Sequence, residues 1–159
     1  MRALRFGPAL AFAATVALGG CTAYPGRGGL ALDPTQTDLL TREFDQQLNH
    51  QLTAMVASAE IDPDGKLLFN HAPGDQRFLE PNSGRYWQIS GEGQEVFPSR
   101  SLWDRRLEAS GRKAWTEPLY YNSDQFPDEP LRVVERTIRL PGSDVEWQFV
   151  VARARDELD

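Results

Sequence analysis

The chain has 159 residues, a formal net charge of −6 and an isoelectric point near 5.0, which suits one domain with flanking segments. A mildly acidic chain without a basic stripe has nothing to hold phosphates, so nucleic acid is excluded as a partner. With one cysteine, Cys21, and two histidines, His50 and His71, a Cys/His zinc site is excluded as well. No cofactor is indicated.

The first 22 residues have the pattern of an export signal or a membrane anchor. Arg2 and Arg5 precede an uncharged run that ends in Leu18-Gly19-Gly20-Cys21. This ending is similar to a bacterial lipoprotein box, in which Cys21 is lipidated and becomes the mature N-terminus. The alternative is a transmembrane helix over residues 6–26, a run just long enough for a hydrocarbon core of about 30 Å. Both interpretations place the rest of the chain in the periplasm, anchored to the membrane of the cell envelope.

A Gly-rich linker over residues 23–32 leads to a long predicted helix over residues 33–62. Asp33 is a good N-cap, and Pro34 suits the first helical position. Apolar residues recur at spacings of three and four along one face: Leu40, Phe44, Leu48, Leu52, Met55, Val56 and Ala59. We expect the C-terminal half to pack on the domain's own sheet. The narrow stripe of the N-terminal half predicts a homodimer seam.

Residues 63–155 read as the globular domain, which is mostly strands. Residues 85–89 and 95–97 flank Gly91-Glu92-Gly93 as a hairpin, and Trp87 and Trp103 make it the expected centre of the core. Further predicted elements are strands at 66–70, 115–121, 131–140 and 145–154, the last two forming a second hairpin, and a short helical turn at 102–107. The predicted fold is α+β, a long N-terminal helix followed by a roughly five-stranded antiparallel sheet.

The search for catalytic residues is mostly negative. No Gly-rich phosphate loop is present. Ser99 and Ser101 flank Arg100, and a serine hydrolase would need a histidine such as His71 to approach them in space. Three carboxylates could supply a glycosidase pair, although surface carboxylates are far commoner: Asp104, Glu108 and Glu117.

Two polar clusters are candidates for binding. Three acidic residues of one loop offer the hard oxygen ligands that suit calcium or magnesium, although their spacing matches no calcium loop: Asp124, Asp128 and Glu129. Three arginines could face an anion: Arg100, Arg105 and Arg106. Alternatively, Arg100 forms an ion pair with Asp104, four residues on, if the turn is helical.

Several segments carry a resemblance to a known family. In chain order they are Phe44-Asp45 with Leu48, residues 57–65, 77–78, 81, 83–89, 131–136 and 150–153. The most specific is Ser99-Arg100-Ser101-Leu102-Trp103-Asp104, which follows the Tyr86-Trp87-Gln88-Ile89 strand. From about residue 44 onwards the chain resembles the extracytoplasmic sensor region of proteobacterial two-component sensor histidine kinases.

The resemblance implies a periplasmic domain, often PAS-like, between two transmembrane helices, and a dimer that passes a signal to a cytoplasmic kinase. It also implies structural roles for the signature residues, with Arg100 and Asp104 holding a corner of the sheet: Trp87, Arg100, Leu102, Trp103 and Asp104. Residues 156–159 stand where the family enters its second membrane helix, and His50 lacks the phosphoacceptor motif. We therefore expect either a truncated or split kinase gene product or a free-standing, lipid-tethered protein.

Three functional hypotheses follow. The first is a membrane-tethered periplasmic sensing module of two-component signalling, working with a kinase in cis or in trans. The second is a free-standing lipoprotein that serves as a binding or structural module. The third is a small hydrolase. The sequence names no ligand.

Overall fold

The computed structural model describes residues 33–71 and 74–157. The signal or anchor segment with Cys21 and the linker lie outside the described residues. Contacts group Leu32–Asp159 in one compact unit. Within the described ranges, no helix combines the length and the apolar composition needed to cross a membrane.

The long helix, α1, spans Pro34–Ser58. Its N-cap is Asp33, whose side chain accepts a hydrogen bond from the Thr35 amide at 2.8 Å. The C-terminal half packs on the sheet, as predicted, through its buried residues: Phe44, Leu48, Leu52 and Met55. The N-terminal half leaves Leu39 and Leu40 exposed, at 59% and 40%.

The helix ends earlier than residue 62, so the prediction of its C-terminal boundary was wrong. Residues Ala59–Ile61 form a short strand, β1, which pairs with β2, Leu67–Phe69, as a separate antiparallel ribbon. Asp62 precedes Pro63, and a residue before proline is biased towards extended backbone. The Asp62 carboxylate also accepts the amides of Asp64 and Lys66, which closes the turn of the ribbon.

The main sheet has five antiparallel strands, which confirms the predicted α+β fold and is consistent with a PAS-like domain. The strands are β3 Arg85–Gly91, β4 Phe97–Pro98, β5 Leu119–Ser123, β6 Leu131–Ile138 and β7 Trp147–Ala154, in the order β4-β3-β7-β6-β5. Both predicted hairpins are present: Ile89 pairs with Phe97, and Thr137 pairs with Gln148. Three short 3-10 helices complete the fold: η1 Gln76–Leu79, η2 Arg100–Leu102 and η3 Arg155–Glu157.

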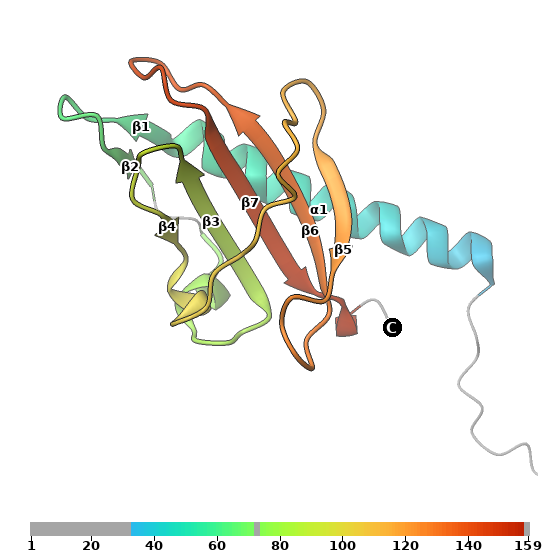
Figure 1. The fold of residues 1–159 in the computed structure, drawn as a ribbon. Coiled ribbons are helices and arrows are strands. Elements are labelled where there is room, and N and C mark those ends of the chain that lie inside the picture. Colours follow the sequence, from blue (N-terminus) through green and yellow to red (C-terminus); the bar gives the residue numbers. More distant parts are fainter. Residues whose placement is uncertain (1–32, 72–73, 158–159) are drawn as a thin grey trace, which may run out of the picture. The chain divides into compact units, whose positions relative to one another are not determined.

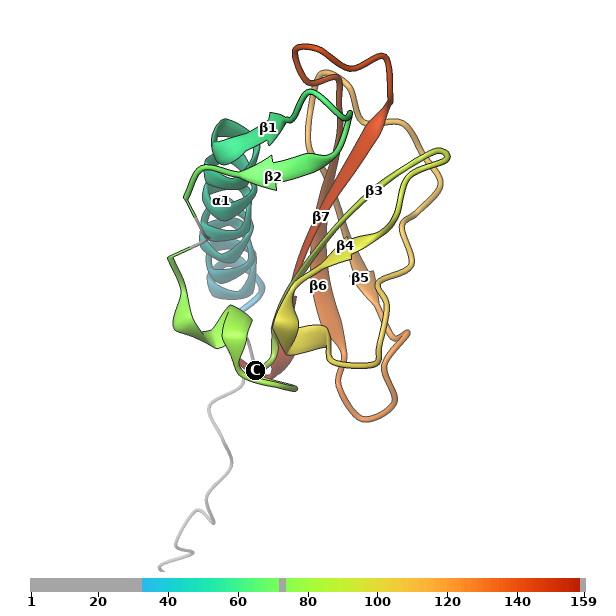
Figure 2. The same ribbon diagram turned by 90° about the vertical axis from the view of Figure 1, so that its left-hand side faces the viewer.

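The two faces of this sheet are covered by different parts of the chain (Figure 1; Figure 2). One face packs against α1 and the β1–β2 ribbon, around Trp87, Trp147 and Phe149. The other face is crossed by residues 103–118, which connect η2 to β5 without regular secondary structure. We call these residues the strap. The strap covers the polar side chains that form the candidate site.

Candidate functional site

The first contact between strap and sheet is made by Gln88, a buried residue of β3. Its Nε2 donates to the Leu107 carbonyl at 2.8 Å, and its Oε1 accepts from the Leu107 amide at 2.9 Å. Leu107 is itself buried against Tyr86 and Leu102. One amide side chain therefore satisfies both backbone groups of a buried strap residue.

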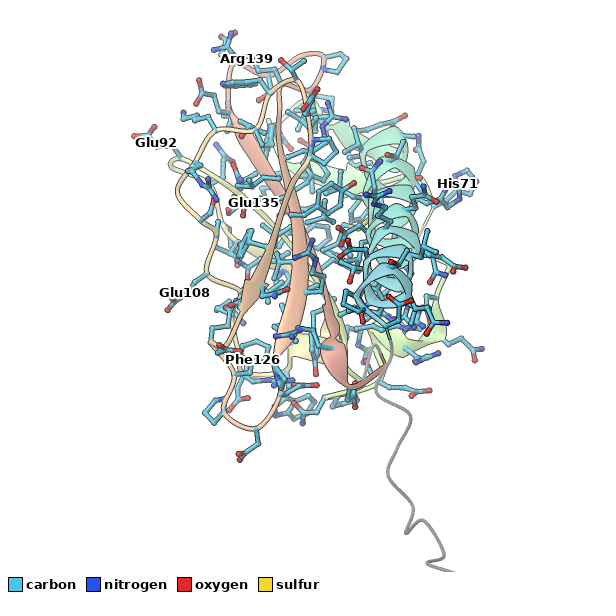
Figure 3. The ribbon with its side chains drawn as sticks, turned by 90° about the vertical axis from the view of Figure 1, so that its right-hand side faces the viewer. His71, Glu92, Glu108, Phe126, Glu135 and Arg139 are labelled. Carbon is cyan, nitrogen blue, oxygen red and sulfur yellow. The ribbon has the colours of Figure 1, made fainter. Side chains whose placement is uncertain are left out.

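The second contact is made by Glu135, on the strap side of β6 (Figure 3). Its side chain is 0% exposed. Its carboxylate accepts hydrogen bonds from the Ser110 amide at 3.1 Å, from the Ser110 hydroxyl and from the Tyr121 hydroxyl at 3.0 Å. In the described structure, all these donors are neutral. Burial, followed by the charge and hydrogen bond of Glu135, raises the pKa of Tyr121.

The third contact lies one step along β6, at Thr137. Its amide donates to the Ala114 carbonyl at 3.0 Å, and its hydroxyl accepts from the Ala114 amide at 3.0 Å. Because that hydroxyl accepts from the strap, it donates to Gln148 Oε1, 3.0 Å away. The Gln148 Nε2 atom is buried and has no hydrogen-bond partner in the described part of the chain. A buried amide without a partner is uncommon and calls for an explanation.

A charged network closes the face at its other end. Arg105 of the strap donates to Glu129 at 2.9 Å and to the Tyr86 hydroxyl at 2.7 Å, and Tyr86 donates to Glu129 at 2.8 Å. The Arg105 guanidinium lies 4.1 Å from the Phe126 ring centroid. Burial and the bond to Glu129 raise the pKa of Tyr86. Burial alone would lower the pKa of Arg105, but its bonds to Glu129 and Tyr86 raise it.

The proposed cation ligands on the acidic loop are not brought together as a site. Glu129 is held by Arg105 and Tyr86, whereas Asp124 and Asp128 are exposed. Among the described residues, no group of three or more His, Cys, Asp and Glu side chains could hold a metal ion. Through Glu129 the loop closes the strap face, and within the described residues its three acidic side chains do not converge on one point.

The serine pair forms a structural hydrogen-bond chain. Ser101 Oγ donates to the Arg85 carbonyl at 2.6 Å, so Ser99 Oγ donates to Ser101 Oγ at 2.8 Å and accepts from the Trp87 amide at 3.1 Å. Both serines are buried. His71, the histidine that a hydrolase would need, lines a pocket on the α1 side with His50. These contacts position η2 beside β3.

The signature segment 99–104 is split between core and surface. Leu102 is 0% exposed and Trp87 is 7% exposed, but Trp103 is 70% exposed, so the prediction that Trp103 anchors the sheet was wrong. The chain turns outwards at Trp103, whose φ is +56°, once Leu102 has taken the buried position. The predicted Arg100–Asp104 pair is also not formed among the described residues, because η2 is a three-residue 3-10 helix and gives no i,i+4 face.

The remaining candidates lie on the surface of the described structure. The three carboxylates considered for a glycosidase pair are exposed: Asp104, Glu108 and Glu117. Figure 3 shows Glu108 pointing away from the sheet. Arg106 is also exposed, and its guanidinium donates to the Arg105 carbonyl. The anion cluster of three arginines is thus divided, since Arg105 alone faces the strap-covered site.

The sequence analysis missed Gln88, Glu135 and Gln148. A usable signal was present in β6 and β7. In Leu131-Arg132-Val133-Val134-Glu135 and in Trp147-Gln148-Phe149-Val150-Val151, apolar residues fall on both faces of the strand. Strands with that pattern are covered on both faces of their sheet. Because one helix can cover only one face, the pattern implied that another segment covers the other.

Comparison with protein families gives one match that extends over most of the chain. The family described as two-component sensor kinase N-terminal matches residues 30–159. Searches of curated proteins and of solved structures gave no significant match. The match includes α1, both sheets and the strap. The chain belongs to the family of two-component sensor kinase N-terminal regions.

Proposed function

We propose that this chain is a membrane-tethered sensing module that faces the periplasm and binds its signal on the strap-covered face of the sheet. It passes the signal to a histidine kinase, in cis or in trans. Membership of the sensor kinase N-terminal family carries this proposal. The buried polar groups beneath the strap support the choice of face, because ligand sites combine a sheltered surface with a few convergent polar groups.

The tether in this proposal is the segment 1–22, through a lipid on Cys21 or a membrane span. Alkaline phosphatase fused after residue 157 should be active in cells, because the enzyme folds only outside the cytoplasm. Palmitate should label the wild-type chain and not Cys21→Ser if the anchor is a lipid. An inactive fusion would contradict the periplasmic orientation. Labelling of Cys21→Ser would contradict the lipoprotein anchor and leave the membrane span.

The partner in this proposal is a second copy, paired along the N-terminal half of α1. Residues 34–40 are all exposed, and Leu39 and Leu40 leave large apolar side chains in solvent. Apolar residues on an exposed helix face favour a helix–helix seam. This pairing would bring two copies together at the end of α1 that leads to the tether.

Cysteine cross-linking tests the seam. Leu40→Cys should form a disulfide-linked dimer in membranes under mild oxidation, beyond any dimer that the wild-type chain forms through Cys21. Arg42→Cys is the matched control, because residue 42 lies about 200° around the helix from residue 40 and is also exposed. Equal cross-linking of the two variants would contradict a seam on this face.

A further inference from the structure

The middle of the strap covers the sheet thinly. Residues 108–113 are all exposed, whereas Leu107 and Ala114 on either side are buried. We call residues 108–113 the lid. Ser110 bonds to the sheet through Glu135, and at the start of the lid the Glu108 carbonyl lies 3.4 Å from the Tyr121 hydroxyl. The next residue, Gly111, has φ +74° with open space around it, a backbone conformation that glycine adopts without strain. A segment with few buried contacts opens at low cost.

Beneath the lid lies a carboxylate that is buried without a cation among its described hydrogen-bond partners. Removing a charge from water is costly unless a partner of opposite charge offsets it. Arg112 is near enough for its charge to oppose the rise in the pKa of Tyr121. Neither Arg112 nor Lys113, which pairs with Glu146, is among the described hydrogen-bond partners of Glu135. The three hydrogen bonds of Glu135 come from neutral donors, so no opposite charge among these partners offsets the charge of the carboxylate.

A second polar group on the same face also lacks a partner within the described residues. Glu135 is paired with Val150 across β6 and β7, and Gln148 is two residues further along β7. Side chains in this diagonal relation lie about 7–8 Å apart at the backbone, within reach of one small molecule. The buried Gln148 Nε2 is a donor. The face thus offers an anionic acceptor and, diagonally from it, a neutral donor.

A hollow in the surface lies next to the site formed by Glu135 and Gln148. It has a volume of ≈ 520 Å³ and is lined by Trp115, Thr137, Ile138, Arg139 and Glu146. Thr137 contacts Gln148 directly, so the hollow adjoins the covered site at the C-terminal side of the lid. Figure 3 shows Arg139 at one end of the molecule and Glu135 further along the same sheet. A small ligand can therefore approach without displacing the Arg105 network.

We propose that the lid opens to admit a small organic cation, which takes the place of Ser110 on Glu135. The ligand is a primary amine with an oxygen acceptor close to its nitrogen. Its ammonium group donates to the Glu135 carboxylate, and its oxygen accepts from Gln148 Nε2. The ammonium brings a charge opposite to that of the carboxylate as well as its hydrogen bonds, and a buried carboxylate gains more from such a partner than from neutral donors, so the ammonium outcompetes the serine. This inference rests on the proposed sensing function and names the class of its ligand.

The exchange makes the lid responsive to the ligand. In the free protein Ser110 bonds to Glu135, so residues 108–113 are held on the sheet. In the bound protein these bonds are lost, and the lid keeps only the contacts at its two ends, those of Glu108 with Gln125 and Tyr121 and the Lys113–Glu146 pair. Binding and lid release are thus the same event. An anionic ligand is disfavoured, because Glu135 would face it with like charge.

Titration calorimetry of the full chain in detergent micelles tests the ligand class with ethanolamine as the probe. We expect saturable binding of ethanolamine and none of ethylene glycol, its neutral analogue, or of succinate. Glu135→Gln keeps the shape of the side chain and one acceptor oxygen but removes the charge, and should weaken binding about tenfold or more. Glu108→Gln is the matched control in the exposed lid and should bind as the wild type does. Unchanged binding by Glu135→Gln, or binding of ethylene glycol, would overturn the proposal.

Two further measurements keep the test decisive if Glu135→Gln fails to fold. Ser110→Ala removes a competitor and leaves Glu135 in place, so it should bind ethanolamine several-fold more tightly. Exchange of the Ser110 amide should accelerate when ethanolamine saturates the wild type. Weaker binding by Ser110→Ala, or a more protected amide, would contradict the exchange. The phosphatase fusion and the Leu40→Cys cross-link need no ligand; their success with no binding of ethanolamine would reject the ligand class and leave the sensing module standing.

Discussion

The two faces of the sheet use opposite means to exclude water. On the α1 face, a regular helix inserts aliphatic and aromatic side chains between those of the strands. On the strap face, a smaller apolar cluster that includes Leu107 is joined by hydrogen bonds between the irregular strap and the side chains of Gln88, Glu135 and Thr137. A buried apolar side chain typically contributes more stability than a hydrogen bond, because the hydrogen bond replaces one already made to water.

The α1 face resists partial opening, whereas the strap face can open more easily. Interdigitated side chains resist partial opening, since each gap leaves atoms without neighbours. Hydrogen bonds to a strap can be exchanged for bonds to water or to a ligand at small net cost. The strap face therefore forms the less stable unit of the same domain, and such units are where binding loops and movable segments are found.

The largest expected effect is on the α1 face. Phe149 of β7 is 0% exposed and packs with α1 residues. Phe149→Ala should lower the free energy of unfolding by about 3–5 kcal/mol, through lost burial and the cavity left behind. Urea denaturation of the full chain measures it. Leu79→Ala, at an exposed position of η1, is the control and should change stability by about 0.5 kcal/mol or less. A small cost for Phe149→Ala would remove the contrast between the faces.

A smaller but local effect is expected at the strap. Gln88→Ala leaves the buried amide and carbonyl of Leu107 without partners, and each unsatisfied group costs about 1–3 kcal/mol. Hydrogen exchange should show faster exchange over the strap, with α1 and β7 unchanged. The control is Gln125→Ala, which removes the hydrogen bond that the exposed Glu108 amide makes. Equal loss of protection in α1 would show that the strap is not a separate unit.

The helix and the main hairpin could be predicted from the sequence because their apolar residues recur at regular spacings. The spacing of Phe44, Leu48 and Leu52 identified the buried face of α1, and alternation identified β6 and β7 as a hairpin. The C-terminal boundary of α1 was missed because the three-residue strand β1 is too short to show a period. Its pairing with β2 depends on the turn at Asp62 and Pro63 rather than on a pattern within the strand itself.

The strap face was not readable in the same way. Residues 103–118 have no period, and their polar side chains resemble those of any surface loop. Glu135 reads as a solvated position, because charged residues are rarely fully buried. Trp103 reads as core because of its size, but its exposure depends on the turn at η2. The apolar residues of β6 and β7 imply that both faces of these strands are covered. Only the structure shows that the strap covers one of them.

High pH should distinguish the two faces further. Burial and Glu135 raise the pKa of Tyr121 above its value of about 10 in the unfolded chain. The folded protein holds that proton more tightly, so this stabilisation is complete below pH 10 and is lost as the pH rises above 10. The free energy of unfolding should then fall by up to about 1.4 kcal/mol per pH unit from this group. Tyr121→Phe should show a shallower decline between pH 10 and 11 in urea titrations. If the free energy of unfolding fell equally steeply with pH in the wild type and in Tyr121→Phe, another group would be responsible for the loss of stability.

The α1 face is held mainly by apolar packing, but one polar contact lies at its end. Arg132 donates from Nε and Nη2 to the two carboxylate oxygens of Asp45, each at 2.7 Å. That hydrogen bond, together with the charge of Asp45, raises the pKa of Arg132 against the effect of burial. The pair joins α1 to β6 beyond the apolar core, where the helix passes from its packed to its exposed half.

A double-mutant cycle measures this link. Asp45→Asn and Arg132→Gln should couple by about 1 kcal/mol, since the pair is bidentate and mostly buried. The exposed Arg139–Glu146 pair is the control and should couple by close to zero. Such coupling would mean that α1 is held at its exposed half by a polar contact that a signal can weaken. Absence of coupling would mean that the helix is fixed by apolar packing alone, and that polar control is confined to the strap face.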